Sequence, residues 1–135
     1  METVGKRVQC EAEIVANERL QGDYFRLVLR APLIAAEAVP GQFVHLRIPG
    51  LEHRLLRRPF SICDAVPEKG TLRVVYKVVG EGTRHMASLV PGQCFDAIGP
   101  QGRGFSMSAA TSDAPALIVA GGYGCAAMLL LAKQI

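Results

Sequence analysis

The strongest constraint on the fold is a run of short, strand-length segments, each separated from the next by a turn that contains Gly or Pro. Residues 71–79 form the clearest segment, because β-branched and aromatic side chains are dense there. Residues 42–48 alternate between apolar and polar side chains, as a strand with one buried face does. The expected strands are 8–18, 24–30, 42–48, 60–63, 71–79 and 94–98. This spacing predicts an all-β, antiparallel Greek-key barrel.

Three later segments depart from the strand pattern. Residues 83–89 place apolar side chains around one short helical turn, and Thr83 stands where an N-cap residue would stand. Residues 99–104 are rich in glycine and are expected to form a hairpin or a linker. Residues 106–115 are rich in Ser, Thr and Ala and are expected to form a loop. We therefore expect the barrel domain to cover residues 1–106.

The final segment has a different pattern. Residues 116–120 are a continuous apolar run, which is typical of a parallel strand buried on both faces. A turn with Gly121, Gly122 and Gly124 follows, and residues 125–135 then have helical periodicity. Strand, glycine turn and helix predict the first β-α unit of a doubly wound α/β domain. Because one such unit cannot bury its own faces, we expect residues 107–135 to be a linker and the start of an incomplete, truncated domain.

Composition and patterning disfavour several classes of protein. The net charge of +3 is too small to predict nucleic-acid binding. The N-terminus has no apolar signal-peptide core, and glycines interrupt the apolar C-terminal stretch, so we expect a cytoplasmic protein without a membrane span. The three histidines lie on separate predicted elements, which disfavours hydrolytic catalysis and a metal site. No catalytic side chain is predicted.

The four cysteines are dispersed at Cys10, Cys63, Cys94 and Cys125, without the close spacing of cluster ligands. We therefore expect reduced thiols and no iron–sulfur cluster held by this chain alone. On an extended strand, Cys63 shares a face with Ser61. It is expected to be either a small apolar filler or a neighbour of a ligand bound near Ser61.

A basic loop with Arg54, Arg57 and Arg58 precedes the fourth predicted strand. An arginine fork makes bidentate, charge-assisted bonds to phosphate oxygens, so the loop could seat a phosphorylated ligand. Pro59 biases Arg58 towards an extended backbone, which fixes the direction of its side chain. Taken alone, the motif is weak, because an arginine pair before a proline is more often part of a solvated loop.

Two glycine turns lie next to predicted helices. Gly80 and Gly82 let a backbone approach a ligand closely, and free N–H groups at a helix start favour an anion. The turn at residues 121–124 lies between a strand and a helix, which is the context of a phosphate-binding turn, but it lacks the full dinucleotide fingerprint. Each turn, taken alone, also fits an ordinary connection.

The order of these motifs is more specific than any one of them. Arg-Pro-x-Ser at 58–61 is followed by Gly-x-Gly-Thr at 80–83, Gly-Pro-x-Gly-x-Gly-Phe at 99–105 and Gly-Gly-x-Gly at 121–124. This order resembles the ferredoxin–NADP reductase superfamily, and within it the electron-transfer subunit of class B dihydroorotate dehydrogenase, over residues 8–135. The resemblance implies FAD on the barrel and NAD(P) on the α/β domain that follows.

The resemblance also implies which residues contact each cofactor. Arg58 would bind the FAD pyrophosphate, and Ser61 would reach the edge of the isoalloxazine ring. A second strand would present backbone atoms and an aromatic ring to the cofactor, and the next helix start would bind its phosphates. The implied FAD contacts are Arg58, Pro59, Phe60, Ser61, Val75, Tyr76, Lys77, Gly82 and Thr83. The implied NAD(P) contacts are Gly121, Gly122 and Gly124.

The implied activity is that of an FAD-dependent oxidoreductase component in a hetero-oligomer. Its catalytic partner, a flavoprotein subunit, would oxidise dihydroorotate to orotate in pyrimidine biosynthesis, and this chain would pass the electrons to NAD(P). Relatives of this subtype carry a two-iron, two-sulfur cluster, for which this chain has no ligands, and Ala127 stands where the family commonly has Pro. We expect the fragment not to be fully active alone.

Other functions stay open at this point. They are a stand-alone flavin or ferredoxin–NAD(P) reductase, a hydrogenase or sulfide-dehydrogenase gamma-type subunit, and a barrel that binds a ligand without catalysis.

Overall fold

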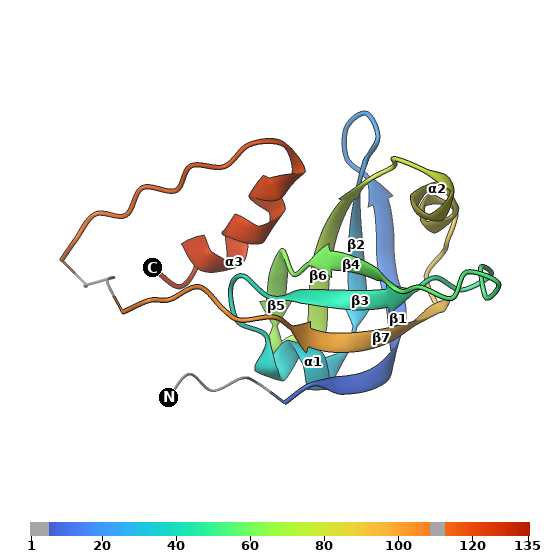
Figure 1. Ribbon diagram of the computed structural model, residues 1–135, viewed down its shortest axis with the longest axis horizontal. Helices are drawn as coiled ribbons and strands as arrows, with labels where there is room; N and C mark the ends of the chain where they lie inside the picture. The colour runs from blue at the N-terminus through green and yellow to red at the C-terminus, as the bar shows by residue number, and fades with distance from the viewer. Residues whose placement is uncertain (1–5, 109–112) are drawn as a thin grey trace.

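The structure is a computed structural model that describes residues 6–108 and 113–135, and these residues form one antiparallel, seven-stranded sheet (Figure 1). The strands lie side by side in the order β4-β3-β7-β1-β2-β6-β5. Their bounds are β1 Val8–Arg19, β2 Tyr24–Arg30, β3 Phe43–Arg47, β4 Arg58–Ser61, β5 Asp64–Val66, β6 Thr71–Lys77 and β7 Cys94–Gln101. The helices are α1 Pro32–Glu37, α2 Glu81–Ala87 and α3 Met128–Ala132, with 3₁₀ helices η1 Pro67–Lys69 and η2 Gly122–Ala127.

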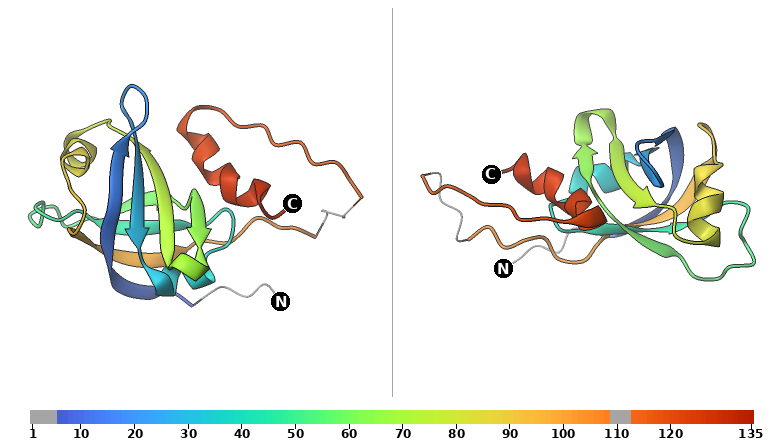
Figure 2. Two further views of the ribbon diagram at one scale, coloured as in Figure 1. Left: turned by 180° about the vertical axis from the view of Figure 1, so that it is seen from behind. Right: turned by 90° about the horizontal axis from the view of Figure 1, so that it is seen from above.

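The sheet curls into an open barrel around a single core (Figure 2). Register shifts between Ile14 and Ala16 on β1 and between Phe43 and His45 on β3 interrupt the ladders, and such bulges bend a sheet. Side chains alternate along the strands, so every second residue enters the core. The antiparallel barrel expected from the sequence is therefore confirmed, with seven strands where six were expected.

Two short elements that the sequence pattern did not predict close one end of the barrel. Helix α1 starts with Pro32 in its first turn, where the missing N–H is not needed, and it buries Ile34 and Ala35. Strand β5 is three residues long and is followed by η1. Gly70 ends η1 with φ +63°, and a Cβ there would lie 2.9 Å from Cβ of Pro32. The glycine therefore lets η1 pack tightly against the start of α1.

The structure corrects the expected start of helix α2. The helix begins at Glu81 and has Gly80 as its N-cap, so Thr83 lies inside the first turn. The Thr83 Oγ1 accepts hydrogen bonds from the backbone N–H of Val79 (2.9 Å) and of Gly80 (3.2 Å). Thr83 thus acts as the third-position member of a capping box, reaching back to the cap, and the expectation that it is the N-cap was wrong.

The glycine-rich segment after residue 98 also differs from the sequence expectation. Strand β7 continues through the cis Gly99–Pro100 bond to Gln101, and the turn begins only at Gly102, whose φ is +83°. A Cβ on Gly99 would lie 3.3 Å from a Val44 methyl group and 3.4 Å from an Ile34 methyl group. A glycine fits there because the strand passes close to the core.

The expected parallel strand at residues 116–120 was wrong. These residues have no strand assignment, and Leu117 and Val119 are 89% and 85% exposed. A parallel strand needs neighbouring strands for its hydrogen bonds and helices for its two faces, and no described strand pairs with this segment. The expected helix is partly confirmed as η2 and α3, which fold back against the barrel and bury Ala126 and Leu130 (Figures 1 and 2).

Among the described residues, no helix has both the length and the apolar character needed to cross a membrane.

Candidate functional site

The candidate site is the open seam between β4 and β6. These strands stand far apart in the sheet order, yet the curl of the sheet brings them into contact without a hydrogen-bonded ladder between them. Strand β5 pairs only with residues 71–73 of β6, so the rest of β6 has one edge that no described strand covers. A pocket of about 240 Å³ lies in the seam. It is lined by Pro59, Phe60, Ser61, Val75, Tyr76, Lys77, Val79, Thr83, Tyr123 and Ala126.

Arg58 lies at the end of the seam against the start of α2. A Cβ built on Gly82 would lie 2.5 Å from Nε of Arg58, so the guanidinium stem rests directly on the Gly82 backbone. Gly82 has no positive φ that would require glycine. Glycine is therefore needed at position 82 because a larger residue would collide with the Arg58 side chain. Its absence of a side chain lets the Arg58 side chain of β4 pack against α2.

Two of the three arginines of the basic loop form ion pairs, and the third does not. Arg54 and Arg57 form ion pairs with Glu81 and Asp96. Arg58 has no ion-pair partner among the described residues, although its side chain is half-buried. A half-buried guanidinium without a carboxylate is suited to an external anion, because its fork can make two parallel bonds to phosphate or carboxylate oxygens.

Thr83 lines the pocket, but its hydroxyl is already used. Besides accepting from the N–H groups of Val79 and Gly80, it lies 3.3 Å from the Gly80 carbonyl oxygen, to which it donates. The first N–H groups of an α-helix lack an intrahelical acceptor. The backbone N–H groups that this end of α2 leaves without an intrahelical acceptor are therefore those of Glu81, Gly82 and Thr83.

The ends of the two strands supply the remaining polar groups of the pocket. Ser61 is exposed at the end of β4, and Lys77 ends β6, with its Nζ 5.6 Å from the centre of the Tyr24 ring. The ring of Phe60 meets that of Tyr76 edge-on, with centroids 6.2 Å apart. The pocket thus combines apolar walls with an uncovered strand edge.

Tyr76 lines the pocket, as the resemblance implied, but most of its side chain lies in the core. Its side chain is 3% exposed, and its ring stacks on Phe25 with centroids 5.5 Å apart. Its hydroxyl donates to Oδ1 of Asn17 (3.0 Å), and Nδ2 of Asn17 donates to the carbonyl oxygens of Met86 and Leu89. Tyr76 therefore borders the pocket mainly as a core residue, and it links β6 through Asn17 to the end of α2.

We expect Tyr76→Phe to lower the free energy of unfolding by about 1 kcal/mol, because it leaves Oδ1 of the Asn17 side chain without its donor. Urea unfolding followed by circular dichroism measures the change. Tyr24→Phe is the control, since the Tyr24 hydroxyl has no hydrogen bond within the described chain. Equal stabilities of wild type and Tyr76→Phe would contradict the assignment.

Burial raises the pKa of Tyr76 from 10 to about 12, while the hydrogen bond with Asn17 acts in the opposite direction. The unfolded chain therefore loses this proton first as the pH rises, and stability contributed by the neutral phenol is complete below pH 10. We expect this contribution to be lost between about pH 10 and pH 12. The difference in unfolding free energy between wild type and Tyr76→Phe, measured across that range, should shrink with pH; a constant difference would contradict this.

Cys63 does not line the pocket. It is 4% exposed in the connection between β4 and β5, and burial raises the pKa of its thiol. Of the two interpretations of Cys63, the apolar filler is therefore the one that the structure supports. Within residues 6–108 and 113–135, no group of three or more Cys, His, Asp or Glu side chains could hold a metal ion.

The glycine turn at the C-terminal end lies beside the same seam. Tyr123 and Ala126 of η2 line the pocket, and Tyr123 is exposed. A Cβ on Gly121, Gly122 or Gly124 would meet nothing within 4 Å, so the backbone of the turn is open to an approaching molecule. Val79, Tyr123 and Ala126 are pocket residues that the sequence did not predict.

Comparison with known proteins decides the family. The model of the oxidoreductase FAD-binding domain family matches residues 11–105. The chain belongs to this family. The chain is 38% identical over 126 residues to the dihydroorotate dehydrogenase B (NAD(+)) electron transfer subunit of Geobacillus kaustophilus, covering 93% of this chain and 49% of the relative. The subunit of the same name from Fusobacterium nucleatum is 33% identical, over 92% of this chain and 48% of the relative.

The chain spans about half the length of the curated relatives it matches. Among solved structures, the NADH-dependent reduced ferredoxin–NADP oxidoreductase is 33% identical with a TM-score of 0.64, covering 70% of this chain and 34% of that protein. The cytochrome P450 reductase of Amycolatopsis has a TM-score of 0.80 at 23% identity, over 98% of this chain and 40% of that protein, which shows the shared fold.

The residues of the seam fit an FAD. A dinucleotide cofactor needs a cation for its pyrophosphate and apolar walls for its flavin ring. Arg58 supplies a guanidinium without an ion-pair partner in the described chain, and the missing side chain of Gly82 leaves the space that this guanidinium occupies. Phe60 and Val75 supply apolar wall.

Proposed function

We propose that the open seam holds FAD, and the observation that carries this proposal is Arg58. Its guanidinium rests on Gly82 and has no ion-pair partner among the described residues, whereas Arg54 and Arg57 both have one. Neither Arg58 nor Gly82 lines the pocket itself, but their chain neighbours Pro59 and Thr83 do. Membership of the FAD-binding family supports the same reading.

The proposed roles follow from the position of each residue. Arg58 binds the pyrophosphate through its fork, and the backbone N–H groups of Gly82 and Thr83 donate to phosphate oxygens. Ser61 and the uncovered edge of β6 at residues 75–77 reach the isoalloxazine ring, and Pro59 and Phe60 shape the wall. When bound, FAD supplies transfer of a hydride and of single electrons. The protein orients the ring and limits the access of water to it.

For the whole protein, we propose electron transfer between a catalytic, dihydroorotate-oxidising subunit and NAD(P), within a hetero-oligomer. The names of the relatives at 33–38% identity support this activity. Residues 107–135 would then be the linker and the start of the NAD(P)-binding domain, with the open turn of Gly121, Gly122 and Gly124 facing the nucleotide. Any iron–sulfur cluster would have its ligands outside this chain.

Flavin reconstitution tests the first step. The purified protein is incubated with FAD, freed of excess cofactor by gel filtration and measured by absorbance in the flavin bands. We expect stoichiometric FAD, and a colourless protein would overturn the proposal.

Partner specificity is tested with the loaded protein under anaerobic conditions. Bleaching of the flavin by dihydroorotate is expected only when a catalytic subunit of dihydroorotate dehydrogenase B is added. Bleaching by NADPH or reduced ferredoxin, with no response to dihydroorotate and that subunit, would favour a stand-alone reductase.

A further inference from the structure

Asp64 is unusual because it is the one buried residue with a formal charge among the described residues. Its side chain is 3% exposed at the start of β5. A buried carboxylate is strongly unfavourable unless it is paired and hydrogen-bonded. The groups that pair with the Asp64 carboxylate are therefore important for the stability of this end of the barrel.

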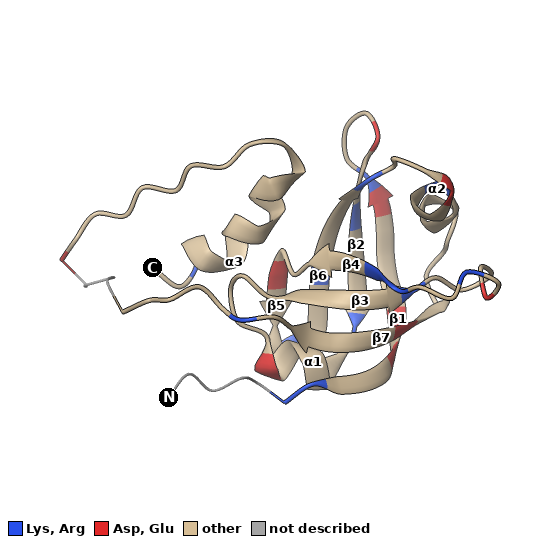
Figure 3. Cartoon of the chain, in the orientation of Figure 1, with Lys and Arg blue, Asp and Glu red and all other residues tan. Residues whose placement is uncertain are grey.

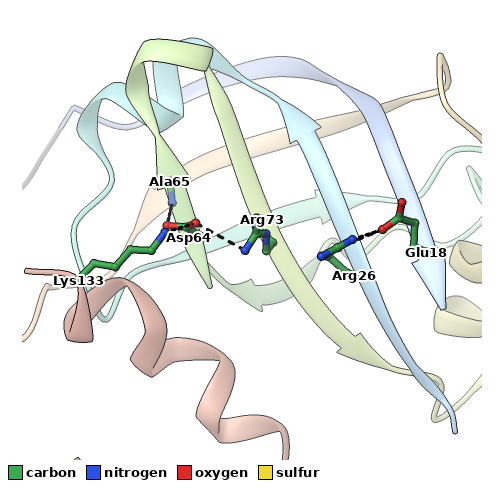
Figure 4. A network of polar contacts seen from close by, with 6 residues as sticks. All are labelled: Glu18, Arg26, Asp64, Ala65, Arg73 and Lys133. Carbon is green, nitrogen blue, oxygen red and sulfur yellow. Dashed lines mark hydrogen bonds and ion pairs between the residues drawn. The ribbon is translucent and has the colours of Figure 1, made fainter. Parts of the chain in front are cut away.

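Three groups surround the Asp64 carboxylate (Figure 4). Nζ of Lys133 donates to Oδ2 at 2.6 Å, and Nη1 of Arg73 lies 3.7 Å from the same oxygen. The backbone N–H of Ala65 donates to Oδ1 at 3.1 Å. Arg73 is the cross-strand neighbour of Asp64 and belongs to the barrel, whereas Lys133 comes from the C-terminal end of α3.

Lys133 is the only charged residue in residues 114–135 (Figure 3). The other contacts of this segment with the barrel are apolar, through the buried side chains of Ala126 and Leu130. Such contacts are non-directional and permit sliding, while an ion pair with a buried carboxylate fixes one position. The one charged side chain of this segment thus pairs with the one buried carboxylate among the described residues.

We propose that the Asp64–Lys133 contact sets the position of η2 and α3 against β5 and β6, and thereby holds Tyr123 and Ala126 in the wall of the pocket. Asp64 and Lys133 are positioning residues in this arrangement. That the wall faces a flavin rests on the proposed function, whereas the docking of the helices does not.

The Glu18–Arg26 pair is a matched control on the same sheet (Figure 4). Both of its side chains are substantially exposed, at 52% for Glu18 and 40% for Arg26, and neither residue is part of the seam. Exposed pairs of this kind contribute little, because solvent screens them. The Asp64–Lys133 contact differs because its carboxylate has left the solvent, although the lysine remains half-exposed.

Hydrogen exchange of the full chain without FAD tests the docking. We expect Lys133→Met and Asp64→Asn each to raise the exchange rates of amides in residues 122–132 on the order of tenfold, by favouring local opening. Lys133→Arg should restore near wild-type exchange, a rescue that loss of packing would not give. Glu18→Gln and Arg26→Met should leave these amides unchanged.

The double variant Asp64→Asn/Lys133→Met separates a direct contact from two independent effects. We expect it to exchange no faster than the more affected single variant, because both changes remove one contact. Unchanged exchange in Lys133→Met, or full additivity in the double variant, would overturn the proposal.

The FAD-loaded protein tests the position of the wall. Quenching of flavin fluorescence by iodide should be stronger in Lys133→Met than in wild type and should return to the wild-type level in Lys133→Arg. If wild type binds no FAD but exchange still depends on Lys133, the docking stands and the proposed function fails. If FAD binds but neither exchange nor quenching depends on Lys133, the docking proposal fails alone.

Discussion

Arg58→Ala is expected to raise the dissociation constant for FAD by about 10- to 100-fold, because a charge-assisted, bidentate contact contributes roughly 1.5–3 kcal/mol. The physical reason is that Arg58 has no ion-pair partner in the described chain and would be the main cation for the pyrophosphate. Quenching of free flavin fluorescence on titration with apoprotein measures the constant.

Two variants make the Arg58 result specific. Arg84→Ala removes the same charge from an exposed position on α2 and should leave the dissociation constant within about twofold, since solvent screens an exposed charge. Arg58→Lys keeps the charge but loses the planar fork, so its affinity should fall between those of wild type and Arg58→Ala. Equal affinities for wild type and Arg58→Ala would place the pyrophosphate elsewhere.

Gly82→Ala is expected to have the second large effect on FAD affinity, because it disrupts the contact between Gly82 and Arg58 by changing the glycine. The new Cβ would lie 2.5 Å from Nε of Arg58, which is too close, so the arginine side chain must move away. We expect FAD affinity to fall by about as much as in Arg58→Ala, on the order of tenfold or more. Thermal stability should change little, because the displaced group is a flexible side chain and the backbone φ is ordinary.

Gly80→Ala is the control for Gly82→Ala in the same turn. A Cβ at Gly80 meets nothing within 4 Å, and its extended backbone suits any residue, so affinity should be unchanged. In an Arg58→Ala background, Gly82→Ala should cause no further loss of FAD affinity, because the two changes disrupt the same contact. Independent, additive losses would show that Gly82 acts on the cofactor without Arg58.

Much of the barrel could be predicted because most of its strands carry their own signals. Residues 24–30 and 71–77 have strand-forming side chains between turn residues, and the structure has strands at both ranges. Strand β5 and helix α1 were not predicted because they are three and six residues long. Such short segments do not show a recognisable period of apolar residues. Residues 116–120 have the composition of a buried strand, but a strand also needs a neighbour, which composition does not supply.

At the candidate site, β4 and the turn before α2 could be identified from the sequence, because each corresponds to a motif of consecutive residues. Tyr123 and Ala126 could not be predicted, because they reach the pocket only through the return of the C-terminal segment to β6. The inward place of Tyr76 could have been predicted. It shares strand parity with Leu72 and Val74, both of which are buried.

The open seam also has a consequence for folding. A closed barrel completes its ladder with its own backbone, but here residues 74–77 of β6 keep an uncovered edge within the described chain. Any ligand that occupies the seam of the native state, and not the unfolded chain, adds its binding free energy to stability. At a free concentration 100 times its dissociation constant, this is about 2.7 kcal/mol. Cofactor supply would therefore set how much of the domain survives proteolysis in the cell, and unloaded copies would be removed first.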